Sequence, residues 1–200
     1  MVCCTFDAVR HGGDRKNMFM ERKMMHQKTM QMVTKTGKQI TARPLTAYDA
    51  PYLVDIFEHM SAESRYRRFQ QSLENPNPKQ VWEEAEKIAQ MESEQQGGFM
   101  AFWQRTFLPD VPVGAARYVR LDENTAEMAM SIRDDMQGEG IGTWLLGLAI
   151  DDARAAGVRQ LVGSALNDND AIWRVLDKLG YPYRRKPDGL ISEIEVDIGE

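Results

Sequence analysis

A turn with glycine at every second position constrains the fold of this chain more than any other feature. The turn is the segment 137–142 (QGEGIG), and it follows an apolar stretch at 126–132. The residues at 141–155 carry apolar side chains at helical spacing, and the following Gly157 is typical of a helix end. The sequence therefore predicts a strand, a polar turn and a long helix, with glycines in the first turn of that helix.

A glycine-rich turn at the start of a helix suits the binding of a phosphate group. Glycine has no side chain, so the backbone N–H groups can approach an anion closely. The first turn of a helix adds N–H groups without intrahelical partners and a partial positive charge. A helix start without any ligand is the alternative, but glycine in a helix costs about 1 kcal/mol relative to alanine. That cost favours a binding role for the turn.

Two common nucleotide-binding turns do not match this segment. A P-loop requires Lys after its last glycine, and neither Gly140 nor Gly142 is followed by Lys. A dinucleotide-binding turn requires G-x-G-x-x-G directly after its strand. Here the glycines alternate, and polar residues separate them from Ile132. ATP and NAD are therefore poor candidates for the ligand.

The turn resembles the signature Q/R-x-x-G-x-G/A of the GNAT superfamily of N-acetyltransferases, with Gln137, Gly140 and Gly142 at the defining positions. A second block, 169–181, is similar to a later helix of that family, which runs from an Asn to a Gly-aromatic pair. The segment 61–69 resembles the first helical region of the acetyltransferase module in bacterial protein-lysine acetyltransferases that act on acyl-CoA synthetases. The similarity extends over residues 39–198.

The order of predicted elements agrees with that resemblance. The elements are a strand at 39–43, helices at 46–58, 62–71 and 81–91, strands at 99–105, 113–121 and 126–132, a helix at 141–155, a strand at 160–165, a helix at 170–179 and a strand at 190–198. Thr46 and Ser61 are the expected N-caps of the first two helices. The predicted fold class is α/β: the GNAT fold, with a central mixed twisted sheet of about six to seven strands and helices on both faces.

Residues 1–36 differ in composition from the remainder of the chain. They are rich in Met, Lys and Arg and lack clean strand alternation. A poorly ordered N-terminal extension is predicted at 1–36, followed by a GNAT acetyltransferase domain at 37–200. Met18, Met25 and Met32 fall at heptad spacing, which leaves a short helix or a partner contact as the alternative.

The resemblance implies acetyl-CoA as the cosubstrate and a set of contacts with it. The pantetheine arm would pair with the strand before the turn, the turn would hold the pyrophosphate, and the next helix would contact the arm. The implied cofactor-binding residues are Met130, Ser131, Ile132, Gln137, Gly138, Glu139, Gly140, Ile141, Gly142, Thr143 and Asn169. No metal site is expected, because Cys3 and Cys4 are the only cysteines and lack partner ligands.

Glu127 is the predicted catalytic residue. Attack on a thioester needs a neutral amine, and deprotonating a lysine with a pKa of about 10.4 at pH 7 costs about 4.6 kcal/mol. Glu127 is the only acid in the apolar strand 126–132, where burial would raise its pKa toward that of a useful base. In the lysine acetyltransferases that the chain resembles, a Glu at this position is the general base, acting directly or through water. A solvated Glu on an edge strand, paired with Lys or Arg, is the alternative.

Six other positions bear on the mechanism. Many GNAT enzymes carry a Tyr at the position of Leu176, where it protonates the leaving thiolate. Its absence favours the protein-lysine group, whose members often lack it. Asp134 and Asp135 are expected to fix the corner between strand and helix. The arginines within 65–68 could meet an acidic protein surface or the 3′-phosphate of CoA, or form a solvated basic face.

Charge and hydropathy restrict the remaining function classes. The net charge of −5 argues against a general nucleic-acid binder. No apolar run approaches the roughly 18 residues that span a bilayer, and no signal-peptide core is present, so no membrane partner and a cytoplasmic location are expected. The predicted function is acetyl transfer to a primary amine, with a protein lysine preferred. A small-molecule amine acceptor and a non-catalytic acyl-CoA sensor are the alternatives, and a homodimer is left open.

Overall fold

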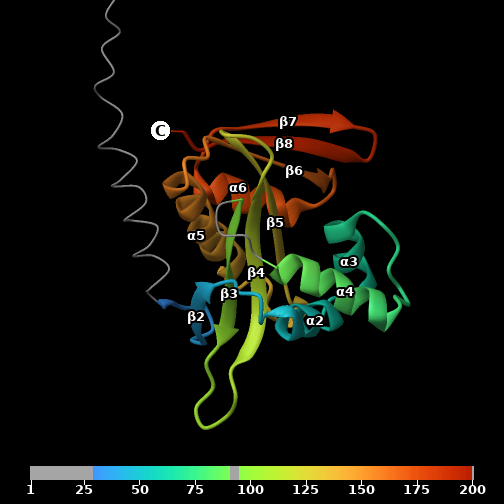
Figure 1. Cartoon of the computed structure of the whole chain (residues 1–200), viewed down its shortest axis with the longest axis vertical. Helices are drawn as coiled ribbons and strands as arrows, with labels where there is room; N and C mark the ends of the chain where they lie inside the picture. The colour runs from blue at the N-terminus through green and yellow to red at the C-terminus, as the bar shows by residue number, and fades with distance from the viewer. Residues whose placement is uncertain (1–28, 91–94, 200) are drawn as a thin grey trace, which may run out of the picture.

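The computed structural model of the protein describes residues 29–90 and 95–199, which form one mixed sheet covered by helices (Figure 1). The eight strands lie in the order β1-β2-β3-β4-β5-β6-β8-β7. The strands are β1 (Met30–Val33), β2 (Gln39–Pro44), β3 (Gln96–Trp103), β4 (Val111–Arg120), β5 (Thr125–Ile132), β6 (Gln160–Leu166), β7 (Tyr183–Asp188) and β8 (Ile191–Asp197). The helices are α2 (Ala50–Glu58), α3 (Ala62–Phe69), α4 (Pro78–Ala89), α5 (Ile141–Ala155), α6 (Asp170–Leu179) and the short 3₁₀ helix η1 (Asp134–Met136).

Two groups of helices cover opposite faces of the sheet, α5 and α6 on one and α2 to α4 on the other (Figure 1). On the first face, Tyr118 of β4 packs in a core with Leu146 of α5. On the second, Ala115 of β4 packs with Ile56 of α2 and with Met60. Because successive side chains of a strand alternate between faces, even-numbered residues of β4 from Gly114 onward face α5 and odd-numbered ones face α2 to α4. Val113 also packs on the α5 face, because the register between β3 and β4 shifts at this residue. The predicted α/β architecture with helices on both faces is confirmed.

The pairing between β5 and β6 is short and is the only parallel pairing among the described strands. It joins residues 125–127 of β5 to 160–162 of β6. The other neighbouring strands of the described sheet are antiparallel. Beyond Glu127 the register between β5 and β6 stops, so among the described strands the remainder of β5 pairs with β4 alone.

The helix boundaries agree with the prediction within two residues except at the starts of α2 and α4. α4 begins at Pro78, three residues before the predicted start. Ser61 caps α3 as expected, since its side chain accepts a hydrogen bond from the Ser64 N–H. The predicted cap at Thr46 is wrong, because α2 begins only after Asp49, which occupies the N-cap position. The Asp49 carboxylate accepts hydrogen bonds from the N–H and hydroxyl of Thr46 and pairs with Arg43 at 2.6 Å. This ion pair holds the segment in a turn that precedes the helix.

Two outer strands, β1 and β7, are absent from the sequence prediction and bring the sheet to eight strands. β1 lies inside the segment 1–36 assigned to the N-terminal extension, and it pairs with β2. Met18 and Met25, of the predicted heptad, lie outside the described residues. β7 contains the sequence RRKPD, and β8 is its one neighbour in the described sheet. An outer strand tolerates such residues because one of its edges faces solvent.

Candidate functional site

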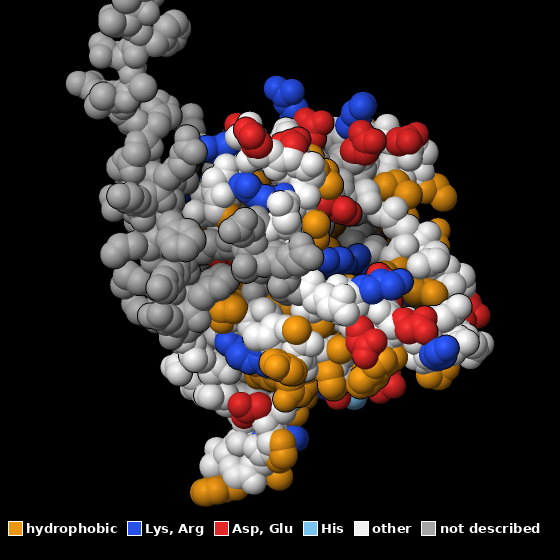
Figure 2. All heavy atoms as spheres, in the orientation of Figure 1, with side chains coloured by type: hydrophobic (Ala, Val, Ile, Leu, Met, Phe, Trp, Pro, Cys, Tyr) orange, Lys and Arg blue, Asp and Glu red, His pale blue; other side chains and the backbone are white. Residues whose placement is uncertain are grey.

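A groove separates β5 from β6 beyond the point where their pairing ends. Its volume is about 370 Å³, and residues 128–132 of β5 and 163–165 of β6 line it. Arg67 of α3 and Asn169 at the start of α6 also contribute to the lining. Figure 2 shows a hollow between the strands β6 to β8 and helix α3, with Lys or Arg side chains at its rim. Since α3 and α6 cover opposite faces, the groove passes through the gap in the sheet.

The backbone of β5 presents hydrogen-bonding groups to this groove. The N–H of Arg133, directly after β5, donates to the Val113 carbonyl of β4. Because the backbone direction alternates along a strand, odd-numbered residues of β5 turn these groups toward β4 and even-numbered residues toward the groove. Of the predicted contacts, Met130 and Ile132 therefore present main-chain groups to the groove, whereas those of Ser131 turn toward β4.

The glycine turn closes one end of the groove and presents backbone N–H groups. Gly138 and Gly140 have φ of +75° and +89°, a left-handed conformation that favours glycine. Trp144 is the first residue of α5 whose N–H is bonded to a preceding carbonyl, that of Gly140. The earlier N–H groups have no partner within the helix, namely those of Ile141, Gly142 and Thr143. Together with the partial positive charge of a helix start, they suit an anion such as a pyrophosphate.

Side chains of the glycine turn form hydrogen bonds with neighbouring segments of the protein. The Gln137 amide donates to the Ile132 carbonyl at 3.3 Å. The Glu139 carboxylate is turned toward the β1–β2 hairpin, where it accepts hydrogen bonds from the hydroxyl and N–H of Thr36 and from Lys38. These bonds, above all that from the Thr36 hydroxyl, hold the pKa of Glu139 below its ordinary value. The turn thus offers mainly its main chain to a ligand.

Asn169 combines helix capping with a place in the groove wall. Its side-chain oxygen accepts a hydrogen bond from the Ile172 N–H at 3.4 Å and caps α6. This bond uses the oxygen and leaves the amide NH₂ group as a donor. Leu176, at the position of the Tyr found in many GNAT enzymes, is 2 % exposed and packs in the core. That position therefore supplies no proton to the groove.

Glu127 lies where β5 and β6 part. It is the last residue of β5 in register with β6. Its side chain is exposed, so the expected burial is wrong. The reason is the alternation along β5, which buries the neighbouring Ala126 on the α5 side and turns Glu127 to the face of α2 to α4. Arg68 and Arg117 are its charged neighbours on that face. The carboxylate is accordingly open to a group that arrives from solvent.

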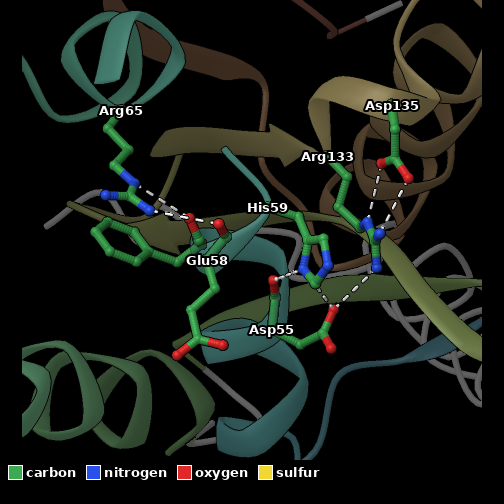
Figure 3. Close-up of polar contacts among 7 residues, drawn as sticks. Asp55, Glu58, His59, Arg65, Arg133 and Asp135 are labelled. Carbon is green, nitrogen blue, oxygen red and sulfur yellow. Dashed lines mark hydrogen bonds and ion pairs between the residues drawn. The ribbon is translucent and has the colours of Figure 1, made fainter. Parts of the chain in front are cut away.

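A buried arginine fixes the corner between β5 and the glycine turn (Figure 3). Arg133 is 8 % exposed and donates to both carboxylate oxygens of Asp135 at 3.0 Å. It also donates to the Asp55 carboxylate of α2 at 3.1 Å. His59, at the end of α2, lies beside Asp55 with its Nδ1 2.8 Å from the Asp55 carbonyl oxygen. Charge-assisted bonds of this kind attach the corner firmly to α2.

Asp134 attaches the same corner to the start of α3. Its N–H donates to the His59 carbonyl, and its carboxylate accepts the Ser61 N–H at 2.9 Å. The Gln137 amide donates to the same carboxylate at 3.0 Å. The prediction that Asp134 and Asp135 fix the corner between strand and helix is confirmed by these contacts. Helices α2 and α3 and the glycine turn consequently share one set of polar contacts.

Two of the arginines within 65–68 are held by the protein itself. Arg65 donates to the carbonyl oxygens of Phe57 and Leu73, which ties α3 to the segments before and after it (Figure 3 shows its contacts with the end of α2). Arg67 pairs with Glu63, one helical turn earlier, at 2.6 Å. A contact of this cluster with the 3′-phosphate of CoA stays a prediction.

Arg117 of β4 belongs to the site and is missing from the candidates found in the sequence. It lies opposite Ala129 of β5, on the same face as Arg68. The sequence does contain a signal for Arg117, because it is the only charged residue in the mainly apolar stretch 111–119. Its neighbours depend on the register between β4 and β5, which the sequence does not provide.

Two further properties concern metals and membranes. Within residues 29–90 and 95–199, no group of three or more His, Cys, Asp or Glu side chains could hold a metal ion. No helix in this part of the chain is long and apolar enough to cross a bilayer.

A family comparison accounts for the fold and the groove together. Residues 39–182 match the acetyltransferase (GNAT) domain. This range contains the elements from β2 to α6, including the glycine turn. The chain therefore belongs to the GNAT family of acetyltransferases, a class of acyl-CoA-dependent transferases. The predicted family, fold and enzyme class are confirmed.

Individual relatives agree with the family assignment. Acetyltransferase Pat of Mycolicibacterium smegmatis is 33 % identical over 167 residues, which are 82 % of this chain and 47 % of that protein. The GNAT domain of S. lividans PAT is 25 % identical with a TM-score of 0.71, over 84 % of this chain and 96 % of that one. These two matches confirm the resemblance to bacterial protein-lysine acetyltransferases. The chain spans about half the length of the Mycolicibacterium relative.

A third relative shows the fold alone. An acetyltransferase from Salmonella typhimurium, solved with its cofactor acetyl-CoA, has a TM-score of 0.60 at 18 % identity. The match covers 80 % of this chain and 95 % of that one.

Proposed function

We propose that the protein transfers an acetyl group from acetyl-CoA to a primary amine of a protein lysine, with Glu127 as the general base. The observation that carries this proposal is the position of Glu127, directly before Met128, where the groove that begins at the glycine turn ends. An anion site and a solvent-accessible carboxylate thus lie at opposite ends of an edge that an extended molecule can follow.

The groove offers suitable contacts along the length of acetyl-CoA. The pyrophosphate would accept hydrogen bonds from the N–H groups of residues 138–143. The pantetheine arm would pair with Met130 and Ile132 between β5 and β6, and Asn169 would contact it from α6. The strand path from Ile132 to Glu127 is about 17 Å at roughly 3.4 Å per residue, so the arm must be extended. Membership of the acetyltransferase (GNAT) family supports this cosubstrate.

The reaction requires one proton to leave the amine. The neutral nitrogen attacks the thioester carbon, a C–N bond forms and the C–S bond breaks. Glu127 accepts the amine proton, directly or through a water molecule, and then passes it to solvent. CoA leaves as a thiolate that takes a proton from water, because Leu176 offers no hydroxyl at the position of the usual acid. The exposure of Glu127 helps, since its proton is exchanged with solvent between turnovers.

The same exposure favours a protein lysine as the acceptor. A lysine on the surface of a folded partner reaches only groups that are open to solvent, and the Glu127 carboxylate is such a group. The two relatives named Pat support this acceptor class.

The substitution Glu127→Gln tests the assignment of the base. With lysine-containing peptides, kcat is expected to fall about 10²- to 10⁴-fold, while the Kd for acetyl-CoA stays close to that of the unchanged protein. The matched control is Glu123→Gln, which alters an exposed acid in the β4–β5 turn. Release of the CoA thiol reports turnover, and calorimetry reports binding.

Two outcomes would contradict the proposal in different ways. If Glu127→Gln left kcat and the pH–rate profile unchanged, another group would be the base. If the unchanged protein bound acetyl-CoA but released no thiol with peptides, spermidine or amino acids, it would be an acyl-CoA sensor and not an enzyme.

A further inference from the structure

A second cavity lies behind β5, on the face covered by α2, α3 and α4. Its volume is about 340 Å³, and apolar side chains such as Ile56, Phe69 and Ile88 line much of it. The cavity and the groove share Arg68 and residues 129–131 in their linings. A ligand that lies in the groove therefore has a mainly apolar side cavity next to the middle of β5.

Two arginines line this cavity without a hydrogen-bond or ion-pair partner among the described residues. Arg68 comes from α3 and Arg117 from β4. In the described part of the chain, neither guanidinium forms a hydrogen bond or an ion pair, and the Nε atom of each is buried. The guanidinium carbon of Arg68 lies 5.0 Å from the ring centroid of Phe69, and this ring offers no hydrogen-bond acceptor in its plane. A buried Nε–H group without an acceptor is unfavourable, so an anion that accepted hydrogen bonds from both arginines would be stabilised.

The pKa shifts of Arg68 and Arg117 also favour the binding of an anion beside them. Burial, and next the charge of Arg117, lower the pKa of Arg68 to about 10, and burial lowers the pKa of Arg117. Glu127 and Glu84 act in the opposite direction on both groups. Neither carboxylate forms an ion pair with them among the described residues. A carboxylate placed between two guanidinium groups would accept paired hydrogen bonds from their planar edges.

We propose that this cavity binds the acyl chain of a dicarboxylic acyl-CoA, with the terminal carboxylate between Arg68 and Arg117. The inference rests on the proposed function, which places the thioester near Glu127. Arg117 lies directly opposite Ala129, and Ala129 is two positions along β5 from Glu127. A short chain that leaves the thioester carbon beside Ala129 therefore passes next to the arginine pair. The apolar lining accommodates its methylene groups.

The cavity suits the acyl donor better than the acceptor. It adjoins the groove along residues 129–131, the stretch of β5 that the pantetheine arm would follow. Glu127, which must meet the acceptor, is open to solvent instead. An acceptor lysine is positively charged before it loses its proton, so the arginine pair repels it.

The transfer of such a group involves the same bonds as acetyl transfer. The amine nitrogen attacks the thioester carbon, the C–S bond breaks and CoA leaves as a thiolate that water protonates. Glu127 accepts the amine proton. The terminal carboxylate stays ionised and unreacted, so the product is an amide that carries a free carboxylate.

Succinyl-CoA and butyryl-CoA provide the test, because their acyl chains have equal length and differ at the terminal group. By calorimetry, we expect the unchanged protein to bind succinyl-CoA at least about tenfold more tightly than butyryl-CoA. Arg117→Met and Arg68→Met are each expected to abolish this preference. Arg117→Lys keeps the charge without the planar fork and is expected to give an intermediate ratio. The matched control is Arg184→Gln on exposed β7, which should keep the full preference.

The results separate this proposal from the one on which it rests. Removal of a buried unpaired charge is expected to leave the thermal midpoint of the Met variants equal or higher, which confirms that they fold. Equal affinity of the unchanged protein for the two compounds would overturn the subsite and leave acetyl transfer standing. A preference that survived in both Met variants would do the same. Failure of the unchanged protein to bind any acyl-CoA would overturn both proposals.

Discussion

The two sides of β5 offer different chemistry to a ligand. Toward β6, the strand offers main-chain groups, and Gly138 and Gly140 continue that edge into the glycine turn. Toward α2 to α4, it offers the Glu127 side chain, beside the pair of Arg68 and Arg117. The first side depends on backbone conformation and the second on strand register. A strand of this kind can hold a common cosubstrate by its main chain while its side chains set the chemistry.

The largest effect is expected from a substitution that changes the backbone conformation of the glycine turn. Gly140→Ala places a side chain on a left-handed residue at the start of α5, so the turn must reorient its N–H groups. We expect acetyl-CoA binding to weaken on the order of a hundredfold, or about 2.7 kcal/mol. The free energy of unfolding should fall by about 1 kcal/mol. Calorimetry and urea denaturation measure the two quantities.

Gly189→Ala is the matched control for that substitution. Gly189 also has a positive φ, +60°, and no atom lies within 4 Å of an added Cβ, but it belongs to the β7–β8 hairpin. A similar loss of stability with unchanged acetyl-CoA binding is expected. If both variants lost affinity equally, strain and not the position of the turn would explain the effect.

An intermediate effect is expected from a substitution of Arg133, which fixes the corner between β5 and the glycine turn. Arg133→Gln removes the bonds to Asp55 and Asp135, whose side chains are 40 % and 59 % exposed. Because these acids are partly solvated, we expect a loss of only about 1–2 kcal/mol in the free energy of unfolding. Since the corner holds both α2 and the glycine turn, acetyl-CoA affinity and kcat should both fall severalfold.

Lys186→Gln gives the comparison for an exposed ion pair. Lys186 and Glu193 are 78 % and 58 % exposed, so a change below about 0.5 kcal/mol is expected. Urea denaturation of both variants, followed by kinetic assays, checks the contrast. Normal kcat in an Arg133→Gln protein of reduced stability would show that the two sides work independently.

The smallest effect concerns the pH dependence of the same corner. Partial burial raises the pKa of Asp134, but hydrogen bonds from Ser61 and Ser64 and the charge of Arg65 outweigh it, so the pKa lies below its ordinary value. This stabilisation is complete above the unfolded pKa of about 3.9 and is lost as the pH falls through the lower folded value. Because Asp134 is partly solvated, its size is on the order of 0.5 kcal/mol.

Asp134→Asn should therefore be less stable than the unchanged protein at pH 7, and the difference should shrink between about pH 4 and pH 2. Asp110→Asn, at an exposed position in the β3–β4 hairpin, should show no such trend. Urea denaturation across this range gives the comparison. A difference that grew as the pH fell would contradict the assigned direction of the pKa shift.

Most of the fold could be predicted because local signals agree with the tertiary structure. α5 has the predicted bounds, since the glycine turn marks its start and Gly157 follows its end. β7 could not be predicted, because its charged sequence with a proline is tolerated only at an outer edge. β1 is short, and only its pairing with β2 reveals it.

The candidate site likewise has some features that the local sequence predicts and others that depend on tertiary structure. The glycine turn and Asn169 follow from sequence motifs, because their contacts use adjacent residues. The exposure of Glu127 follows from which face of β5 packs on α5, and the neighbours of Arg117 follow from its register with Ala129. Such relations connect residues far apart in the chain, so no local pattern contains them.

The divergence of β5 and β6 also affects the protein when the groove is empty. Strand edges with free N–H and C=O groups are templates to which extended segments of other chains add. Most sheets have such edges only at their rims, whereas this one has an additional edge in its interior, beyond Glu127. In the complex that we propose, an acyl-CoA would pair with this edge and close it. Cosubstrate concentration then bears on resistance to self-association as well as on the rate of transfer.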